Sequence, residues 1–128
     1  MNDIAGLKVL VADDEKHIRL LLKSVLRAQK ADVVAEASTG QEAIDLFRQL
    51  KPDFAMLDIN MPVKTGVEAL NAILEEFPDA RIIMMTSLSD AQTVEECLEG
   101  GAVGYILKDT PLAEMKQLII DAIHPEAD

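Results

Sequence analysis

Cysteine is scarce in this chain of 128 residues, and basic residues are outnumbered by acidic ones. The one cysteine, Cys97, excludes an internal disulfide framework, as is usual for proteins of a reducing cytoplasm. Long apolar runs are also lacking, since none approaches the roughly 20 residues of a membrane-spanning helix. The first residues, Met1 to Ile4, have neither the basic flank nor the apolar stretch of a signal peptide. We therefore expect a cytoplasmic protein without a membrane segment.

The charge balance and the missing motifs argue against two further classes of protein. Twelve basic and 23 acidic residues give a formal net charge of −11, whereas nucleic acid requires a basic surface. The glycine-rich patterns that cradle phosphates, G-x-G-x-x-G and G-x-x-x-x-G-K-[ST], do not occur. We expect no direct contact with nucleic acid. Carboxylates that hold a metal would explain part of the acidic excess.

Five apolar runs alternate with five amphipathic stretches. The runs are continuously apolar, as in strands that are buried on both faces. They are Lys8 to Ala12, Val33 to Ala37, Phe54 to Asp58, Arg81 to Thr86 and Val103 to Lys108. The stretches carry apolar residues at helical spacing. They run from Ile18 to Leu26, Ala43 to Leu50, Val67 to Phe77, Val94 to Leu98 and Leu112 to Ile123.

Helix start signals support this division. Capping-box patterns begin at Thr39, Thr65 and Ser89. Thr110 precedes Pro111 and is expected to be an N-cap before proline at the first helical position. The length and the apolar content of 49 % fit one domain over residues 1–128. We expect its core at about residues 7–123, with a tail or the start of a linker at 124–128.

Strands and helices in alternation predict the α/β class, with a five-stranded parallel sheet and helices on both faces. Right-handed crossovers limit the topologies. The flavodoxin-like order 2-1-3-4-5 places the first and third strands side by side, and ligands of such sheets bind outside the carboxyl ends of the strands. We therefore expect Asp13 and Asp14, which follow the first strand, to meet Asp58, which ends the third.

A cluster of carboxylates needs a compensating charge. Two unit charges 4 Å apart repel by about 4 kcal/mol at an effective dielectric constant near 20. A hard divalent cation relieves that repulsion. Mg²⁺ suits best because it requires only one or two carboxylates beside waters and a phosphoryl oxygen, and Mn²⁺ is the alternative ion.

The polar strand ends together suggest phosphoryl chemistry. A carboxylate beside a metal can attack phosphorus and form an aspartyl-phosphate, which makes Asp58 a candidate nucleophile. Lys108 and Thr86, which end the last two apolar runs, would hold the transferring group. Simpler interpretations stay open. Asp13 and Asp14 can be a helix cap and its solvated neighbour, Asp58 a strand end bonded to loop amides, Thr86 a packing residue and Lys108 a surface lysine.

Four short motifs occur together in this chain. They are Val11-Ala12-Asp13-Asp14-Glu15, Leu57-Asp58-Ile59-Asn60-Met61-Pro62 with Gly66, Met85-Thr86-Ser87, and Gly104-Tyr105-Ile106-Leu107-Lys108. In combination they resemble the receiver domain of bacterial two-component response regulators, over about residues 7–123. That family commonly has proline directly after the lysine, often with a cis peptide, whereas Asp109 follows Lys108 here. The Lys-Asp-Thr-Pro sequence is similar to that of receivers that precede a helix-turn-helix output domain.

The resemblance implies a metal site and a phosphoacceptor. Asp58 is the expected phosphoacceptor. Asp14, Asp58 and the backbone carbonyl of Asn60 are the expected direct Mg²⁺ ligands, and Asp13 would act mainly through a bound water. With Asn60, Leu88 is expected to influence how water reaches the phosphoryl group.

The resemblance also implies a switch. Thr86 and Lys108 are the expected phosphoryl-binding residues, and Thr86 would move toward the phosphoryl group while Tyr105 turns inward. The face formed by the fourth helix, the fifth strand and the fifth helix would then change its partner preference. Residues expected in or near that face are Val94, Glu95, Leu98, Tyr105, Met115 and Leu118.

The partners implied are a sensor histidine kinase or phosphotransfer protein, an output partner, and a second copy of the chain bound through the same face. The chain is expected to be a regulatory domain that catalyses only its own phosphorylation and dephosphorylation, and otherwise no enzyme.

Two alternatives stay open. A Mg²⁺-dependent phosphohydrolase of the haloacid-dehalogenase type also uses an aspartate nucleophile, but within an Asp-x-Asp pair on its first strand, where this chain has Asp13-Asp14. Its usual cap insertions would have no room. Multiple turnovers on phosphomonoesters would favour the hydrolase, and one phosphoryl group per chain would favour the receiver. A non-phosphorylated interaction module would keep only the fold, and the acids, the threonine and the lysine argue against it.

Overall fold

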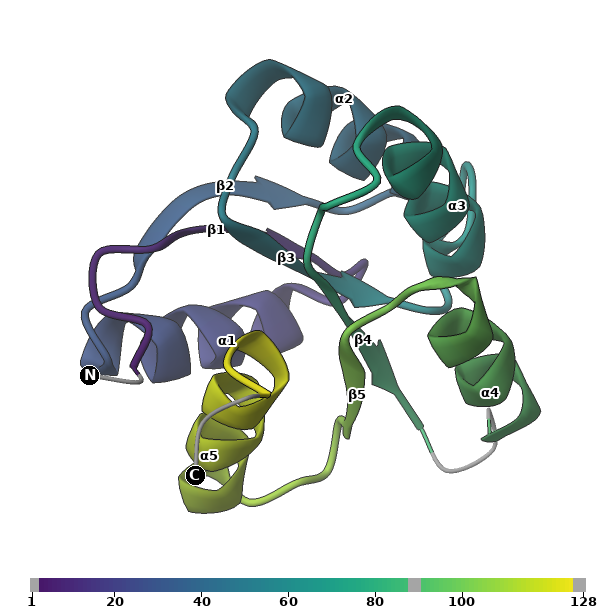
Figure 1. The fold of residues 1–128 in the computed structure, drawn as a ribbon. Helices are drawn as coiled ribbons and strands as arrows, with labels where there is room; N and C mark the ends of the chain where they lie inside the picture. Colours follow the sequence, from purple (N-terminus) through teal and green to yellow (C-terminus); the bar gives the residue numbers. More distant parts are fainter. Residues whose placement is uncertain (1–2, 88–90, 126–128) are drawn as a thin grey trace.

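The structure, a computed structural model, describes residues 3–87 and 91–125, and within these ranges five strands alternate with five helices (Figure 1). The strands are β1 (Lys8–Ala12), β2 (Asp32–Ala37), β3 (Phe54–Asp58), β4 (Ile82–Thr86) and β5 (Gly104–Leu107). The helices are α1 (Lys16–Ala28), α2 (Gly40–Leu50), α3 (Gly66–Glu76), α4 (Ala91–Gly100) and α5 (Leu112–Ile123).

The strands form one parallel sheet in the order β2-β1-β3-β4-β5 (Figure 1). β1 and β3 lie side by side, and their last pairing joins Ala12 to Leu57. The segment after β1 therefore reaches the carboxyl end of β3. This arrangement confirms the expected α/β class, the parallel sheet, the strand order and the single domain.

Helices cover both faces of the sheet, with α1 and α5 on one face and α2, α3 and α4 on the other (Figure 1). Successive residues of a strand point to opposite faces. Val9 and Val11 of β1 therefore pack in the core under α1 and α5, while Leu10 and Ala12 pack in the core under the other three helices. The strands are continuously apolar because each of them supplies both cores.

Cys97 lies in the second of these cores, on the inner side of α4, and is 1 % exposed. Its thiol is free. Burial raises the pKa of this thiol, and the charge of Glu96 adds to that effect. The side chain therefore behaves as a small apolar core residue.

Several element boundaries differ from those expected. The strand expected from Arg81 begins at Ile82. The Arg81 carbonyl still accepts from the Ala55 N–H at 3.0 Å, and the exposed Arg81 side chain donates to the Ile123 carbonyl at 3.2 Å. The last strand is shorter than expected and spans Gly104–Leu107. Leu50 was expected in an apolar stripe but is 39 % exposed. It ends α2, where Lys51 turns the chain with a φ of 45°.

The capping boxes are realised to different degrees. Thr65 and Glu68 form the complete reciprocal pair at the start of α3. Thr39 accepts from the Glu42 N–H at 3.0 Å at the start of α2, as expected. The Glu42 carboxylate, however, accepts from the Ser38 N–H at 3.1 Å and from the Ser38 hydroxyl at 2.7 Å. In the capping box of α2, the Glu42 carboxylate therefore binds the residue before the N-cap instead of the N-cap itself.

The start of α5 differs from the prediction. The helix begins at Leu112 with Pro111 at its N-cap and without a side-chain cap bond, so placing Thr110 at the N-cap was wrong by one position. The capping pattern from Ser89 and the expected role of Leu88 fall outside the described residues. Within the described ranges, no helix combines the length and the apolar character needed to cross a membrane.

Candidate phosphoryl and metal site

Polar side chains reach the carboxyl edge of the sheet from four strands. Asp13 directly follows β1, Asp58 ends β3, Thr86 ends β4 and Lys108 directly follows β5. Asp13, Asp58 and Thr86 are buried, with exposed fractions of 0 %, 2 % and 1 %. Burying polar groups is unfavourable unless they are paired, so their concentration at one edge indicates a site.

The three acids predicted to meet at this edge do so. Asp13, Asp14 and Asp58 each offer a carboxylate oxygen, and these oxygens all lie within 4.8 Å of one another. Asp14 is exposed, whereas the other two carboxylates are buried. The cluster therefore opens to solvent on the Asp14 side.

Lys108 neutralises part of this charge. Its Nζ lies 3.0 Å from Asp58 Oδ1, 3.1 Å from Asp13 Oδ2 and 3.3 Å from Glu15 Oε1. The sequence pattern did not single out Glu15 as a partner of the lysine, although Glu15 lies inside one of the quoted motifs. Lys108 is one cation among Asp13, Asp14, Glu15 and Asp58, so the site keeps an excess of negative charge.

The pKa values reflect burial and crowding. Burial raises the pKa of Asp58 to about 6; Lys108 opposes this shift and the charge of Asp13 adds to it. Burial also raises the pKa of Asp13, against the Glu15 N–H and Lys108. For Lys108 burial acts in the opposite sense, but the hydrogen bonds and charges of Asp58 and Asp13 outweigh it and raise its pKa. The lysine is therefore fully charged at neutral pH.

The donor set fits a hard divalent cation. Asp13 Oδ2 and Asp58 Oδ2 are both buried. Asp58 Oδ2 accepts no hydrogen bond from any described residue, whereas Asp13 Oδ2 lies 3.1 Å from the Lys108 ammonium. A buried acceptor left without a donor destabilises a protein by about 1–3 kcal/mol. Carboxylate oxygens are ligands that Mg²⁺ prefers. Asp13, Asp14 and Asp58 could therefore hold such an ion.

The loop after β3 is fixed close to Asp58. The Asn60 N–H donates to Asp58 Oδ1 at 3.3 Å, and the Gly66 N–H donates to the Ile59 carbonyl at 2.8 Å. A Cβ atom on Gly66 would collide with the Asp58 carbonyl oxygen. The start of α3 thus packs on the backbone of Asp58. The Asn60 carbonyl, expected as a metal ligand, belongs to the same loop.

The N-terminus of α2 holds the outer part of this loop. The Gly40 N–H donates to the Lys64 carbonyl at 3.0 Å, and the Gln41 N–H donates to the Val63 carbonyl at 3.1 Å. Val63 and Lys64 have φ angles of 48° and 84°, in a left-handed region that is unfavourable for a β-branched residue. Contacts with α2 therefore help to keep the loop in a conformation that Val63 disfavours.

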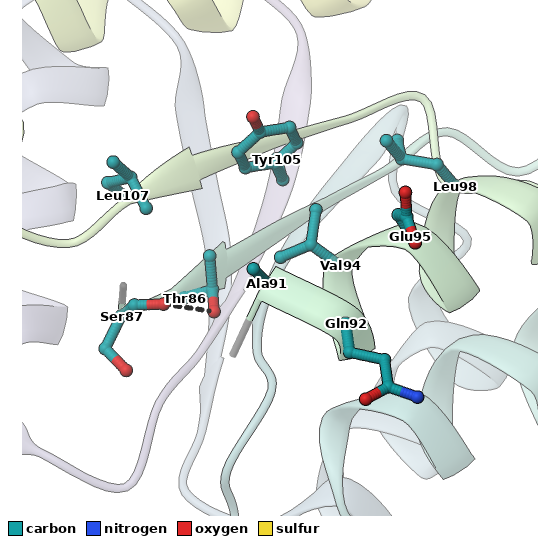
Figure 2. Close-up of a pocket in the computed structure, with 9 residues that line it drawn as sticks. All are labelled: Thr86, Ser87, Ala91, Gln92, Val94, Glu95, Leu98, Tyr105 and Leu107. Carbon is teal, nitrogen blue, oxygen red and sulfur yellow. Dashed lines mark hydrogen bonds between the residues drawn. The ribbon is translucent and has the colours of Figure 1, made fainter. Parts of the chain in front are cut away.

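A cavity of about 570 Å³ lies beside the site, between β4, α4 and β5 (Figure 2). Its lining residues are Thr86, Ser87, Ala91, Gln92, Val94, Glu95, Leu98, Tyr105 and Leu107. The Thr86 hydroxyl donates to the Ser87 carbonyl at 3.0 Å. Tyr105 lines the same cavity but is 47 % exposed. Buried Thr86 and exposed Tyr105 thus border one empty volume.

The face expected to respond is partly surface and partly core. Leu98, Tyr105 and Leu118 are exposed. Met115 is fully buried on the inner side of α5, which packs on the sheet, so placing it in or near the outer face was wrong. Val94 is also buried, at 6 % exposed, but it lines the cavity. The peptide bonds of the described ranges, including Lys108–Asp109, are trans.

Comparisons with known proteins agree with this geometry. A sequence profile of the response regulator receiver domain matches residues 9–120. The transcriptional regulatory protein LnrK of Bacillus subtilis is 39 % identical over 104 residues, which are 80 % of this chain and 47 % of LnrK. The chain therefore spans about half the length of that regulator. Protein CcdB of the same organism is 40 % identical over 111 residues, which are 87 % of this chain and 91 % of CcdB.

A solved structure extends the similarity to three dimensions. A chain of the CheX–CheY–BeF₃–Mg²⁺ complex from Borrelia burgdorferi matches this fold with a TM-score of 0.87 at 28 % sequence identity. The match covers 91 % of this chain and 89 % of that one.

Proposed function

This chain belongs to the family of response regulator receiver domains, and we propose that it is a signalling switch activated by phosphorylation of Asp58. The observation that carries the proposal is the position of the Asp58 carboxylate. It is buried at the carboxyl end of β3, lies 3.0 Å from Lys108 Nζ, and has an oxygen without a hydrogen bond from the described residues. With a pKa of about 6, Asp58 is largely ionised at neutral pH and can act as a nucleophile.

The phosphoryl donor is a phosphohistidine of a sensor kinase or phosphotransfer protein. A lone pair of an Asp58 oxygen attacks phosphorus, the P–O bond forms and the P–N bond breaks. The imidazole nitrogen leaves with the bonding pair and becomes protonated. Mg²⁺, when bound, neutralises the charge that develops on the phosphoryl oxygens.

Residues of the chain hold the reacting groups. Asp13 and Asp14 supply carboxylates to the cation, and the Asn60 carbonyl lies in the loop fixed to Asp58. Lys108 supplies a positive charge at the acceptor carboxylate and binds a phosphoryl oxygen once the bond has formed. Thr86, at the end of the adjacent strand, donates its hydroxyl to another.

Phosphorylation changes the face beside the site. It adds close to two negative charges and three strong acceptors. Thr86 moves toward them, Tyr105 turns into the cavity of about 570 Å³, and the exposed side chains of α4, β5 and α5 are rearranged for an output partner or a second copy. A swing from 1:99 to 99:1 needs about 5.5 kcal/mol. Two or three charge-assisted hydrogen bonds of about 1.5–3 kcal/mol each supply about 3–9 kcal/mol, a range that includes this value.

Acetyl phosphate with Mg²⁺ tests the proposal. Mass spectrometry of the treated chain should show one added phosphoryl group, and this group should be absent after Asp58→Asn and after chelation of the metal. Asp45→Asn, which changes an exposed acid on α2, is the matched control and should still be modified. Modification that survives Asp58→Asn would overturn the assignment. Multiple turnovers of a phosphomonoester would instead favour the hydrolase, which the family assignment disfavours.

A further inference from the structure

Arg19 is a charged residue of α1 that the phosphorylation chemistry leaves unused. Its Nη1 donates to the backbone carbonyl of Asp13 at 2.7 Å, and its Nε donates to Glu36 Oε1 at 3.2 Å. Its side chain is only 17 % exposed. Arg19 thus joins α1, the turn after β1 and strand β2.

The main chain of Asp13 is held on both sides. Its N–H donates to the Ala37 carbonyl at 3.0 Å, and its carbonyl accepts from Arg19. That carbonyl belongs to the planar peptide unit that ends at the Cα of Asp14. A hydrogen bond to it therefore fixes the plane from which the Asp14 side chain leaves. Asp14 is exposed, so packing contributes less to its orientation.

We propose that Arg19, held in place by Glu36, is a positioning residue for the metal site. It fixes the Asp13–Asp14 peptide so that both carboxylates face the cation, and it does so without touching the cation. The inference rests on the proposed function, because it takes Asp13, Asp14 and Asp58 as the residues that hold Mg²⁺.

Lys23 offers a comparison within the same network. Its Nζ lies 2.7 Å from Glu36 Oε2, the other oxygen of the carboxylate that holds Arg19. Its side chain is 16 % exposed, close to that of Arg19. Arg19, however, is the member whose hydrogen bond reaches Asp13. Arg19 and Lys23 form similar ion pairs with Glu36, but the proposal predicts that only the loss of Arg19 lowers the Mg²⁺ affinity.

Calorimetric titration of the metal-free chain with Mg²⁺ tests this directly. Arg19→Ala should weaken Mg²⁺ binding roughly tenfold, the lower end of the effect of losing a group that orients a metal ligand. Arg19→Lys, which can still donate to the Asp13 carbonyl, should recover part of the affinity. At saturating Mg²⁺ the initial rate of phosphorylation by acetyl phosphate should return to that of the parent chain.

Two controls separate positioning from loss of an ion pair. Lys23→Ala removes a partner of Glu36 and should leave the Mg²⁺ affinity within about twofold of the parent, since it breaks no ligand-orienting bond. Arg48→Ala removes a similar pair between α2 and α3, in which Arg48 Nε lies 2.8 Å from Glu76 Oε1, and should leave the affinity unchanged. Thermal unfolding of each variant gives its change in stability.

The outcomes distinguish the two proposals. A parent chain that binds no Mg²⁺ contradicts the metal site and the inference with it. A parent chain that binds Mg²⁺ with the same affinity as Arg19→Ala contradicts the inference alone. If Arg19→Ala does not fold, Glu36→Gln is the deciding variant, because it keeps Arg19 but weakens the ion pair that holds its side chain. A severalfold loss of Mg²⁺ affinity in Glu36→Gln supports the inference, and an unchanged Mg²⁺ affinity overturns it.

Discussion

Two neighbouring parts of the carboxyl edge are built in opposite ways. The acid side, formed by the turns after β1 and β3, is tied down by hydrogen bonds from Arg19, Gly40 and Gly66. The switch side, formed by β4, α4 and β5, contains a cavity of about 570 Å³ and the half-exposed Tyr105 (Figure 2). The comparison suggests a division of labour. If the proposed function holds, the part that is phosphorylated is fixed in advance, whereas the part that changes conformation in response has room to move.

The largest difference between the two sides should come from glycine substitutions. Gly66→Ala on the acid side places a Cβ against the Asp58 carbonyl and should reduce the free energy of unfolding by about 3 kcal/mol or more. Gly100→Ala, at the C-terminal end of α4 and away from the carboxyl edge, meets only Asn71 Oδ1 at 3.5 Å, and should be neutral or slightly stabilising. Urea denaturation of both variants measures the contrast. Equal losses would mean that the acid side is no more tightly built.

Removing the Lys108 ammonium from the acid cluster should have the next largest effect on stability. Lys108→Ala leaves Asp13 and Asp58 buried without their partner and should lower the free energy of unfolding by about 2–3 kcal/mol in the absence of metal. Breaking a fully buried pair costs about 3–5 kcal/mol, and the lysine side chain is 19 % exposed. Mg²⁺ should restore part of the loss. Lys116→Ala on the exposed side of α5 is the control.

The charge of Asp58 should destabilise the metal-free fold at neutral pH. Its pKa rises from 3.8 to about 6 on folding, so the folded chain binds a proton more tightly than the unfolded chain. Stability should therefore be highest below about pH 4, as far as this group is concerned, and should fall as the pH rises through about 6. Asp58→Asn should raise the free energy of unfolding at pH 7 by roughly 1–3 kcal/mol.

The free energy of unfolding, measured with a chelator at pH values below 4 and above 6, shows whether the charge of Asp58 stabilises or destabilises the fold. The gain from Asp58→Asn should shrink as the pH falls from 7 to 4. Asp45→Asn, at an exposed acid, should show no such trend. A loss of stability in Asp58→Asn at pH 7 would contradict the view that burial dominates this carboxylate.

The smallest change in stability should come from the switch side. Tyr105→Ala removes a half-exposed ring and should alter the free energy of unfolding by only about 0.5 kcal/mol. Phosphorylation by acetyl phosphate should proceed at the parent rate, whereas the response of a partner or of dimerisation to phosphorylation should be lost. Partner binding or dimerisation, measured with and without beryllofluoride, separates loss of the response from loss of phosphorylation. Slower phosphorylation of Tyr105→Ala would contradict the view that the switch side does not take part in phosphorylation.

Much of the fold and of the acid cluster could be predicted from the sequence because both depend on strand pattern. Asp13 and Asp58 directly follow or end apolar runs, and parallel strands bring their carboxyl ends to one edge. Their proximity therefore needs only the strand order. The same reasoning placed Lys108, since it directly follows β5.

Side-chain contacts made by helices and loops could not be predicted in the same way. The bond from Arg19 to the Asp13 carbonyl depends on the rotation of α1, and the displaced cap at Glu42 depends on the path of Ser38. Met115 was misplaced because the resemblance assigned it to the outer face, whereas its helical spacing to Ile119 and Ile123 places it on the inner side of α5. Gly66 stood in a motif, but its collision with the Asp58 carbonyl appears only with the backbone in place.

The lone thiol gives this protein a native reporter. Cys97 is buried beneath α4, so a labelling reagent can reach its sulfur only when that helix lifts from the sheet. Its elevated pKa slows the background reaction further. The labelling rate, compared with and without beryllofluoride, would time the opening of α4 in the unmodified sequence.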